Sequence, residues 1–347
     1  MKLLLVSVKS QVSNGGIAVW TDWFLRICQQ RHVECLLVNT ELIGKRAVQS
    51  QAKRNFWDEA VRSWRIFRDL KEQLKEKPDA AHMNTSCGTF GLIRDYMIAV
   101  KIRKAGIPLI THYHCDIHDW VNTPVKRYFL RKLAGCSRKN LVLNEKSWEY
   151  FRSCCGMEAI LLPNFVEDRY IGQPKERVNE KIEQVLYVGR VGTAKGSWEV
   201  YETARRCPNL RFVLIGEISP EAAEWEVPGN VELLGAMPHE AVMQRLPEGD
   251  VFFFPSRSEG CSVALMEAAA QGLPMVATDV GTNRDIVGKA GFVVPKGDVD
   301  AMVQALRQLE DPVLRQQMSV AAVENIRENF SEMQLDKLFT IIRTVTE

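Results

Sequence analysis

Short runs of apolar residues alternate with longer amphipathic segments along the first half of the chain. The runs have the length of buried strands, and segments such as residues 17–28 carry apolar residues at helical spacing. Strands that alternate with helices form parallel sheets, whose ligands gather at the carboxyl ends of the strands. We therefore predict a doubly wound α/β sheet, with strands at residues 1–9, 33–38, 80–84, 107–116 and 140–143.

The same alternation begins again after a hydrophilic run at residues 173–181, which contains Pro174 and reads as a linker. A second sheet is predicted from strands at residues 184–188, 211–216, 231–234, 250–255 and 274–277. The 347 residues suit two domains of roughly 150 to 180 residues each. We place the first at residues 1–170 and the second at residues 171–330.

Composition narrows the class of protein. Hydrophobic residues make up 46% of the chain and charged residues 25%, as in soluble globular proteins. No apolar run reaches the roughly 18 residues of a membrane span, and Lys9 interrupts the opening run too early for a secretory signal. Nine cysteines without regular spacing suggest reduced thiols. We therefore expect a cytoplasmic protein.

The net charge of +2 conceals an uneven distribution. Residues 1–170 contain 27 Lys and Arg against 17 Asp and Glu, a balance of +10, whereas residues 171–347 contain 18 against 26, a balance of −8. Such a division suggests that the first half faces an anionic partner. The stretch from Lys126 to Lys139 holds six basic residues and no acidic one, beside the apolar Tyr128, Phe129, Leu130 and Leu133.

Residues 45–77 form a second basic and amphipathic segment, with Val61, Trp64, Phe67, Leu70 and Leu74 on one side of a predicted helix. Such a helix usually packs on its sheet and leaves its charged face in water. The alternative is a surface that touches anionic lipid together with the stretch from Lys126 to Lys139. A protein docked on the inner face of the plasma membrane would follow from the second interpretation.

Histidines gather after the strand predicted at residues 107–116. His112 and His114 are followed by Asp116, His118 and Asp119, all residue types that bind metals. With His112 and His114 assigned to opposite faces of the strand, the group does not converge on one ion. The sequence Asp298-Val299-Asp300 also resembles a metal motif but is better explained as a helix cap and first turn. We predict no metal site.

The stretch from Ser258 to Thr278 organises the second half. A helix from about Ser262 to Gln271 follows the strand at residues 250–255, and the carboxylates of Glu259 and Glu267 flank its start. Helix N-termini attract anions, so the amides near Cys261, Ser262 and Val263 form a phosphate seat, while carboxylates accept hydrogen bonds from hydroxyls. A nucleotide sugar fits this combination. An ordinary βαβ crossover is the alternative.

Two loops could add to this site. Arg190 and Lys195 follow the strand at residues 184–188 in a glycine-containing loop, where two cations could neutralise a diphosphate rather than lie on the surface as solvated charges. In the first half, Gly15 and Gly16 lie between a strand and a helix and would let the backbone approach a ligand, or form a plain turn.

The motif resembles a known signature. Glu259 and Glu267, separated by seven residues and followed by Ala268-Ala269-Ala270-Gln271-Gly272-Leu273-Pro274, resemble the retaining nucleotide-sugar glycosyltransferases of the GT-B fold, the glycosyl transferases group 1 family of capsule, lipopolysaccharide and glycolipid enzymes. The resemblance extends over nearly the whole chain. It implies two Rossmann-like domains that face a central cleft, an acceptor-side domain first and a donor-binding domain second, with residues 331–347 packing back on the first.

The resemblance also implies roles for individual residues. Arg190 and Lys195 would hold the donor diphosphate, Glu267 the ribose hydroxyls and Glu259 the donor sugar. Gly15 and Gly16 would face the diphosphate, Asn164 would lie in the loop between the domains, and His114 would meet the donor sugar, with His112 as the alternative. Asp285 stands where the family more often has Glu, which makes that contact less certain.

The expected reaction is sugar transfer from a UDP-, GDP- or ADP-sugar to a hydroxyl of a glycan or lipid-linked acceptor, with retention and without a metal or other cofactor. No nucleic-acid partner is expected. Two alternatives stay open. One is a nucleotide-sugar epimerase or hydrolase on the same fold, which would use carboxylates or histidines such as His112, His114, Asp116 and His118. The other is a catalytically silent binding subunit, which would have no evident use for Arg190, Lys195, Glu259 and Glu267 together.

Overall fold

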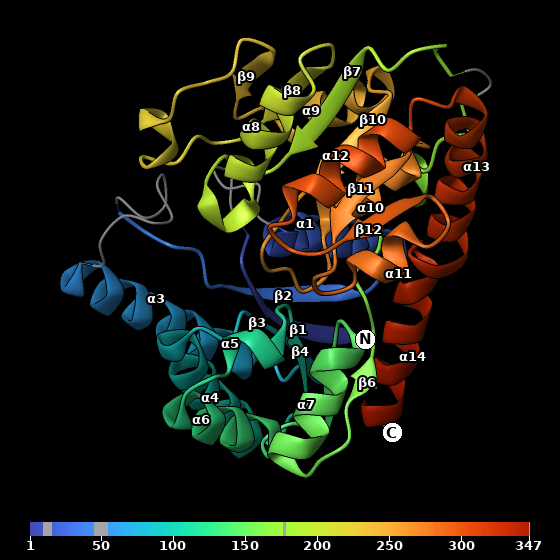
Figure 1. The fold of residues 1–347 in the computed structure, drawn as a ribbon. Helices are drawn as coiled ribbons and strands as arrows, with labels where there is room; N and C mark the ends of the chain where they lie inside the picture. The colour runs from blue at the N-terminus through green and yellow to red at the C-terminus, as the bar shows by residue number, and fades with distance from the viewer. Residues whose placement is uncertain (10–15, 45–54, 176–177, 347) are drawn as a thin grey trace. The chain divides into compact units, whose positions relative to one another are not determined.

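The computed structural model describes residues 1–9, 16–44, 55–175 and 178–346 of the chain (Figure 1). Contacts divide the chain into two compact units, the first formed by Met1–Pro163 with Leu335–Glu347 and the second by Asn164–Gln334. The expected two-domain α/β architecture is confirmed, and each unit contains one six-stranded sheet among its described residues.

The first unit is built on a parallel sheet with the strand order β2-β1-β3-β4-β5-β6. Its strands are β1 (Lys2–Ser7), β2 (Glu34–Asn39), β3 (Ala80–Thr85), β4 (Leu109–Tyr113), β5 (Lys139–Val142) and β6 (Ile160–Leu161). Its helices are α1 (Gly16–Gln30), α3 (Phe56–Lys75), α4 (Thr89–Lys104), α5 (Ile117–Trp120), α6 (Pro124–Ala134), α7 (Glu145–Cys155) and α14 (Met333–Thr346).

Helices cover both faces of this sheet. Buried side chains of α3, α4, α6 and α7 share one core with Ala81 and Met83 of β3. His82 lies between those two residues and points to the opposite face, where its ring stacks on Trp20 of α1. The closing helix α14 joins α1 there, through Phe339 stacked on Phe24 at 5.7 Å. The end of the chain therefore completes the core of its first half.

The second unit has a parallel sheet with the order β12-β11-β10-β7-β8-β9. Its strands are β7 (Gln184–Val188), β8 (Arg211–Ile215), β9 (Val231–Gly235), β10 (Val251–Phe254), β11 (Met275–Thr278) and β12 (Gly291–Val294). Its longer helices are α8 (Ser197–Arg206), α9 (His239–Arg245), α10 (Val263–Ala270), α11 (Asn283–Val287), α12 (Val299–Gln308) and α13 (Pro312–Asn329).

The strand order of the second sheet locates its binding crevice. The chain adds β8 and β9 on one side of β7, then returns to place β10, β11 and β12 on the other side. In open α/β sheets, ligands bind outside the carboxyl ends of the strands where the order reverses. That point lies between β7 and β10, so the loops that follow these two strands border the predicted crevice.

The boundaries between the units differ by a few residues from the predicted ones. The prediction ended the first domain at residue 170 and began its returning helix at residue 331, whereas the structure divides the chain after Pro163 and after Gln334. The side chain of Asn164 donates to the Cys261 carbonyl, and the Val166 amide donates to the Phe330 carbonyl at 2.8 Å. These bonds attach residues 164–170 to the second unit.

None of the helices in the described ranges has both the length and the apolar character needed to cross a membrane.

Candidate functional site

The loop after β7 carries two of the predicted site residues, Arg190 and Lys195. It closes with the 3-10 turn η2 (Thr193–Lys195) and then Gly196, whose φ is +71°. A Cβ at Gly196 would lie 1.9 Å from the Pro255 carbonyl oxygen, so only glycine allows this backbone to approach the end of β10. The contact brings Lys195 beside the loop that follows β10.

Lys195 and Glu259 form an ion pair in this crevice. Nζ of Lys195 lies 2.5 Å from Oε1 of Glu259, and the Ser256 hydroxyl donates to the same oxygen at 2.6 Å. The Glu259 side chain is only 10% exposed, whereas Lys195 is 35% exposed and reaches the pair from the solvent side. Arg190 lies 3.5 Å from Oε2 of Glu217. Each predicted cation is therefore held by a carboxylate.

Helix α10 begins next to this ion pair. Ser262 is its N-cap, and the hydroxyl of Ser262 accepts a hydrogen bond from the Leu265 amide at 3.3 Å. The first amides of a helix, here those of Val263 and Ala264, have no acceptor inside the helix and carry the positive end of its dipole. Burial raises the pKa of the neighbouring Cys261 thiol to about 12, so this thiol stays protonated. The start of α10 thus offers amides rather than a nucleophile.

Glu267 has a partner that the sequence did not indicate. Its Oε1 lies 2.6 Å from Nε2 of His239, the first residue of α9. The two residues are 28 positions apart, and His239 belongs to no recognised motif, so neither spacing nor resemblance identified it. The Glu267 side chain is almost completely buried, and the imidazole is its hydrogen-bond donor.

Asp298 and Asp285 both belong to helix starts in the second unit. Asp298 is the N-cap of α12 and accepts a hydrogen bond from the Ala301 amide at 2.9 Å, so the interpretation of Asp298-Val299-Asp300 as a helix start is confirmed. Asp285 lies within α11, where its carbonyl accepts from the Asn325 side chain. This bond involves only the backbone of Asp285, so the expected contact of its carboxylate stays a prediction.

The predicted orientation of His112 and His114 was wrong. Residues two positions apart on a strand share a face, and the two ring centroids are only 4.2 Å apart. His112 is fully buried, with Nε2 3.1 Å from the Leu162 carbonyl oxygen, and burial lowers its pKa well below the usual value. His114 follows the last residue of β4 and is only partly buried. Of the two candidates, His114 is the accessible one.

A hydrogen-bond network fixes the proton position on two imidazoles. Asn84 donates from Nδ2 to the Ser7 hydroxyl at 2.9 Å, so its Oδ1 faces the rings of His82 at 2.9 Å and His114 at 3.1 Å. Ser7 in turn bonds Thr21, which donates to the Ile17 carbonyl. A carbonyl oxygen can only accept, so both rings carry their proton on Nε2.

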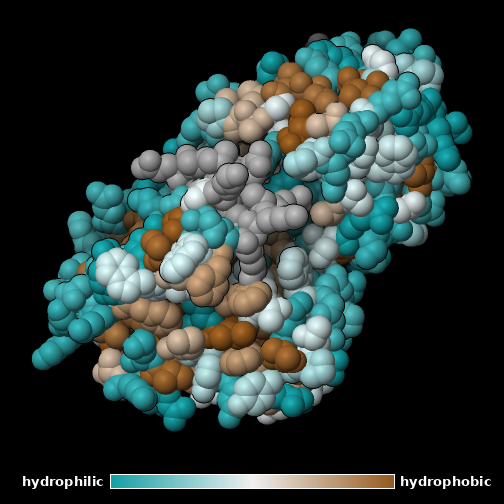
Figure 2. Space-filling view, turned by 90° about the vertical axis from the view of Figure 1, so that its left-hand side faces the viewer, coloured by the Kyte–Doolittle hydropathy of each residue, from teal (hydrophilic) through white to brown (hydrophobic). Residues whose placement is uncertain are grey.

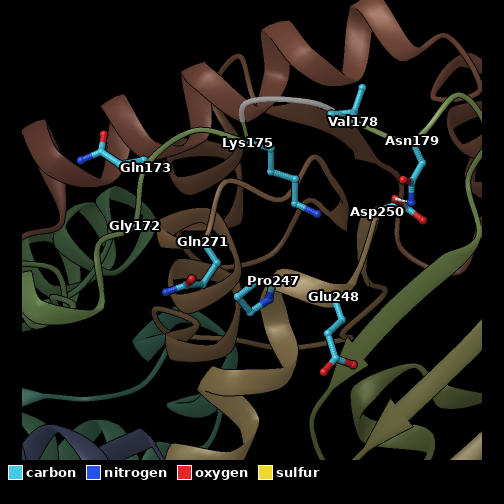
Figure 3. A pocket seen from close by; sticks show the side chains of 9 residues that line it. All are labelled: Gly172, Gln173, Lys175, Val178, Asn179, Pro247, Glu248, Asp250 and Gln271. Atoms are coloured by element: carbon cyan, nitrogen blue, oxygen red, sulfur yellow. Dashed lines mark hydrogen bonds between the residues drawn. The ribbon is translucent and has the colours of Figure 1, made fainter.

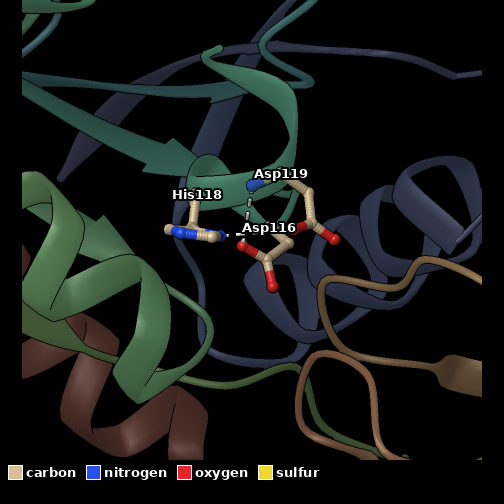
Figure 4. A group of neighbouring side chains, drawn as sticks. All are labelled: Asp116, His118 and Asp119. Carbon is tan, nitrogen blue, oxygen red and sulfur yellow. Dashed lines mark hydrogen bonds and ion pairs between the residues drawn. The ribbon is translucent and has the colours of Figure 1, made fainter. Parts of the chain in front are cut away.

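The group Asp116, His118 and Asp119 has its ligand atoms within 4.8 Å of one another (Figure 4). Oδ1 of Asp116 accepts the Asp119 amide as the N-cap of α5, while the side chains of His118 and Asp119 are largely in water. The group is explained as a cap on a short helix. Together with the buried position of His112, this geometry gives no support to an epimerase or hydrolase that uses these side chains.

The glycine pair is only partly visible. Gly16 is the first residue of α1, and Gly15 lies outside the described residues. The proposed approach of both glycines to a diphosphate therefore stays a prediction.

A cavity of about 440 Å³ in the second unit lies away from the predicted site (Figure 3). Its lining includes Lys175, Asn179 and Asp250, and Asp250 accepts the amides of Glu183 and Gln184 just before β7. The cavity is thus at the amino ends of β7 and β10. Arg190, Lys195 and Glu259 lie at the carboxyl ends of the same strands.

Comparisons with known proteins show what this chain resembles. Residues 169–325 match the family model "Glycosyl transferases group 1". The chain is 25% identical over 298 residues to an alpha-D-kanosaminyltransferase of Streptomyces kanamyceticus, covering 76% of each chain. It is 26% identical over 279 residues to a GDP-mannose-dependent monoacylated alpha-(1-6)-phosphatidylinositol monomannoside mannosyltransferase of Corynebacterium glutamicum, covering 72% of this chain and 73% of that enzyme.

A solved structure extends the match to the fold. The HepE protein of Anabaena, determined in complex with UDP and glucose, superposes with a TM-score of 0.74 at 14% identity over 99% of both chains. Two parallel six-stranded sheets with flanking helices agree with the GT-B type. Residues 169–325 thus match the glycosyl transferases group 1 family, and the chain has the GT-B fold of solved glycosyltransferase structures.

Proposed function

We propose that this glycosyltransferase transfers a sugar from a nucleoside diphosphate sugar to a hydroxyl acceptor with retention of configuration. The observation that carries the proposal is the cluster at the carboxyl ends of β7 and β10, where Lys195 pairs with Glu259 beside the start of α10. Cations and helix amides suit a diphosphate, and carboxylates suit hydroxyls. The complex of HepE with UDP is consistent with a nucleotide donor.

Each side chain has a distinct task in donor binding. Arg190 and Lys195 bind the diphosphate, aided by the amides of Ser262 and Val263, and Glu267 accepts the ribose hydroxyls. When the phosphate occupies Lys195, Glu259 is released to bind hydroxyls of the sugar. Among the donors, UDP-, GDP- and ADP-sugars share this chemistry and differ only in the base.

Charge development explains how the site would accelerate transfer. As the bond from sugar to phosphate breaks, negative charge grows on the phosphate oxygens, and fixed cations and dipoles stabilise that charge most strongly in the transition state. Arg190 and Lys195 would supply what a divalent metal supplies elsewhere, so we propose a metal-independent reaction. The acceptor hydroxyl attacks from the side of the leaving group, and a phosphate oxygen takes its proton.

We assign His114 to the donor sugar. Its Nε2 carries a proton and donates to Asn84 Oδ1, which fixes the orientation of the ring after the end of β4. His112 bonds the Leu162 carbonyl instead and would support the strand end.

The test is donor binding followed by product analysis. Thermal unfolding is recorded with UDP-, GDP- and ADP-sugars, and the matching donor should raise the melting temperature because it binds only the folded state. Turnover of that donor with a hydroxyl acceptor, followed by NMR of the anomeric proton, should give the donor's configuration in the product. Failure of all three nucleotide classes to bind, or an inverted product, would refute the proposal.

We also propose that the acceptor is lipid-linked and that the enzyme is cytoplasmic and docks on an anionic membrane surface. The mannosyltransferase relative acts on a phosphatidylinositol mannoside, which is consistent with such an acceptor. In the first unit, α6 carries the exposed basic residues Arg127, Arg131 and Lys132. Leu130 and Leu133 of the basic stretch are fully buried, so an expectation that these apolar residues enter a lipid headgroup layer is wrong.

Other apolar side chains of the first unit are exposed to solvent and are available for contact with a membrane. On α3, Phe56, Trp57 and Trp64 are 77%, 73% and 63% exposed, whereas Ile66 and Leu70 farther along the same helix are buried. On neighbouring helices, Phe90 of α4 and Tyr128 of α6 are also exposed. Helices α3, α4 and α6 lie side by side, as contacts of Phe67 with Lys101 and of Tyr96 with Phe129 show.

Cations accompany these aromatic rings. Arg68 lies over the Trp64 ring at 5.0 Å, and Lys132 lies over the Tyr128 ring at 5.5 Å. Figure 2 faces the side on which α3, α4 and α6 lie, and apolar surface is interspersed there with hydrophilic surface. Aromatic rings with adjacent cations suit the boundary of an anionic bilayer, where each Lys or Arg contributes roughly 1 kcal/mol.

Liposome co-sedimentation tests this docking. Binding should require anionic lipid, weaken with salt, and fall in Arg127→Gln with Lys132→Gln and in Trp57→Ser with Trp64→Ser. Arg131 is left unchanged because it bonds the Cys154 carbonyl, and Arg211→Gln in the second unit is the matched control. Equal binding to neutral and anionic vesicles would contradict docking on an anionic surface through these basic residues. Binding to neither kind of vesicle would contradict membrane docking and favour a soluble acceptor.

A further inference from the structure

Among the residues that the structure describes, the imidazole of His239 is the side chain that hydrogen-bonds the Glu267 carboxylate. Nε2 of His239 is 2.6 Å from Oε1 of Glu267. The Glu267 side chain is 5% exposed and that of His239 is 21% exposed, so the bond is shielded from competing water. A buried carboxylate anchored through one oxygen presents its second oxygen in a defined direction.

Charged groups from three segments surround the imidazole. Glu267 faces it from α10, Glu240 adjoins it on α9, and Glu167, Arg169 and Tyr170 lie in and before the turn η1 (Asp168–Tyr170). The Tyr170 hydroxyl donates to Glu240 at 2.6 Å, and Arg169 pairs with Glu167 and Glu240. Burial would lower the pKa of His239, but the hydrogen bond and charge of Glu267 outweigh it and raise this pKa. The ring therefore retains its donor proton.

The hydrogen bond between His239 and Glu267 links the start of α9, which follows β9, to the middle of α10. The Glu267 carboxylate is therefore held by a segment other than its own helix. Without the imidazole, the Glu267 side chain would be a buried charge without its donor and would be free to change rotamer. A hydroxyl-binding carboxylate loses affinity when its geometry must be fixed during binding.

We propose that His239 is a positioning residue that aligns Glu267 for the two ribose hydroxyls of the nucleotide donor. The inference rests on the proposed function, in which Glu267 accepts these hydroxyls. His239 would thus help the protein to distinguish ribose from deoxyribose by acting through Glu267, without touching the sugar itself.

Calorimetric titration with two kinds of nucleotide tests the proposal. UDP, GDP and ADP are titrated into the full chain, and the one that binds is compared with its 2′,3′-dideoxy analogue. The measured quantity is the ratio of the two dissociation constants. In the wild-type chain, the ratio should be large because the analogue leaves the buried Glu267 carboxylate without its hydroxyl donors.

The variants His239→Gln and His239→Asn form a matched pair. The Gln amide nitrogen reaches the position of Nε2 and should keep most of the ratio, whereas the Asn nitrogen reaches only the position of Nδ1 and should lower the ratio by about tenfold, the loss of one charge-assisted hydrogen bond. His239→Ala should behave like His239→Asn. Arg245→Gln, an exposed change on the same helix, should leave the ratio unchanged.

The outcomes separate this inference from the proposed function. If the wild-type chain binds none of the three nucleotides, the proposed function fails. If it binds one of them but His239→Asn weakens the ribonucleotide and the dideoxy analogue equally, or neither of them, His239 has no role at the ribose and the inference is overturned while the function stands. Thermal unfolding of each variant is recorded first, and His239→Gln remains informative even if His239→Ala does not fold.

Discussion

Acid should weaken the first unit through His82, a residue outside the candidate site. Its ring is completely buried between Trp20 and Asn84, and burial lowers its pKa from 6.5 to about 4. The unfolded chain therefore binds a proton below pH 6.5 that the folded chain resists. Stability due to the neutral ring is fully present above pH 6.5 and is lost as the pH falls toward 4.

The magnitude follows from the two pKa values. At 1.36 kcal/mol for each pH unit, the folded state loses about 2 kcal/mol between pH 7.5 and pH 5, and about 3 kcal/mol by pH 4. The buried ring of His112 contributes in the same direction, because its pKa is also lowered. A loss of this size is a large fraction of the free energy of unfolding of an ordinary domain.

Urea unfolding at pH 7.5, 6.5, 5.5 and 5.0 measures the effect. His82→Gln keeps a hydrogen-bonding side chain but cannot titrate, so its free energy of unfolding should fall by about 2 kcal/mol less than that of the wild type over this range, whatever its stability at pH 7.5. His118→Gln removes an exposed imidazole and should follow the wild type. Identical slopes for the wild type and His82→Gln would refute the reasoning.

Four further predictions concern the candidate site. Lys195→Ala or Arg190→Ala should lower kcat/KM by a factor equivalent to about 2 to 4 kcal/mol, and wild-type kinetics in both variants would remove these residues from the diphosphate site. Sugar transfer should persist in EDTA, and a loss that Mn²⁺ or Mg²⁺ restores would contradict metal independence. Gly196→Ala should lower the melting temperature markedly, since its Cβ would meet the Pro255 carbonyl, whereas Gly229→Ala has open space and should cost little. Ser262→Ala should cost about 1 kcal/mol in urea unfolding, because the α10 N-cap is lost.

Local sequence patterns were sufficient to predict the two-domain α/β fold and the position of α10, but they predicted only part of the candidate site. The helix predicted at about Ser262 to Gln271 is α10, with Ser262 as its cap, because capping residues and apolar spacing act within a few positions. Lys195 and Glu259 could be placed in adjacent loops because both follow strands of one parallel sheet. Their direct ion pair could not, since it depends on how Gly196 approaches Pro255.

One error was a misapplied strand period, and the others came from contacts that sequence spacing does not encode. His112 and His114 share a face because a strand has a period of two, and their distance depends on the packing of Trp20. The sequence shows apolar residues among the cations of α6, but it did not show that the core of the first unit buries Leu130 and Leu133. His239 reaches Glu267 only through the tertiary arrangement of α9 and α10.

The ion pair between Lys195 and Glu259 gives the proposed reaction a means of releasing its product. Before the donor arrives, the lysine already has an anionic partner, so a nucleotide binds by replacing one anion with another. When an intact donor binds, its sugar hydroxyls replace Lys195 as the partners of the Glu259 carboxylate. The spent nucleoside diphosphate carries no sugar, so Glu259 competes with it for Lys195. Glu259→Gln should therefore bind the free nucleoside diphosphate more tightly than the wild type and be more strongly inhibited by it.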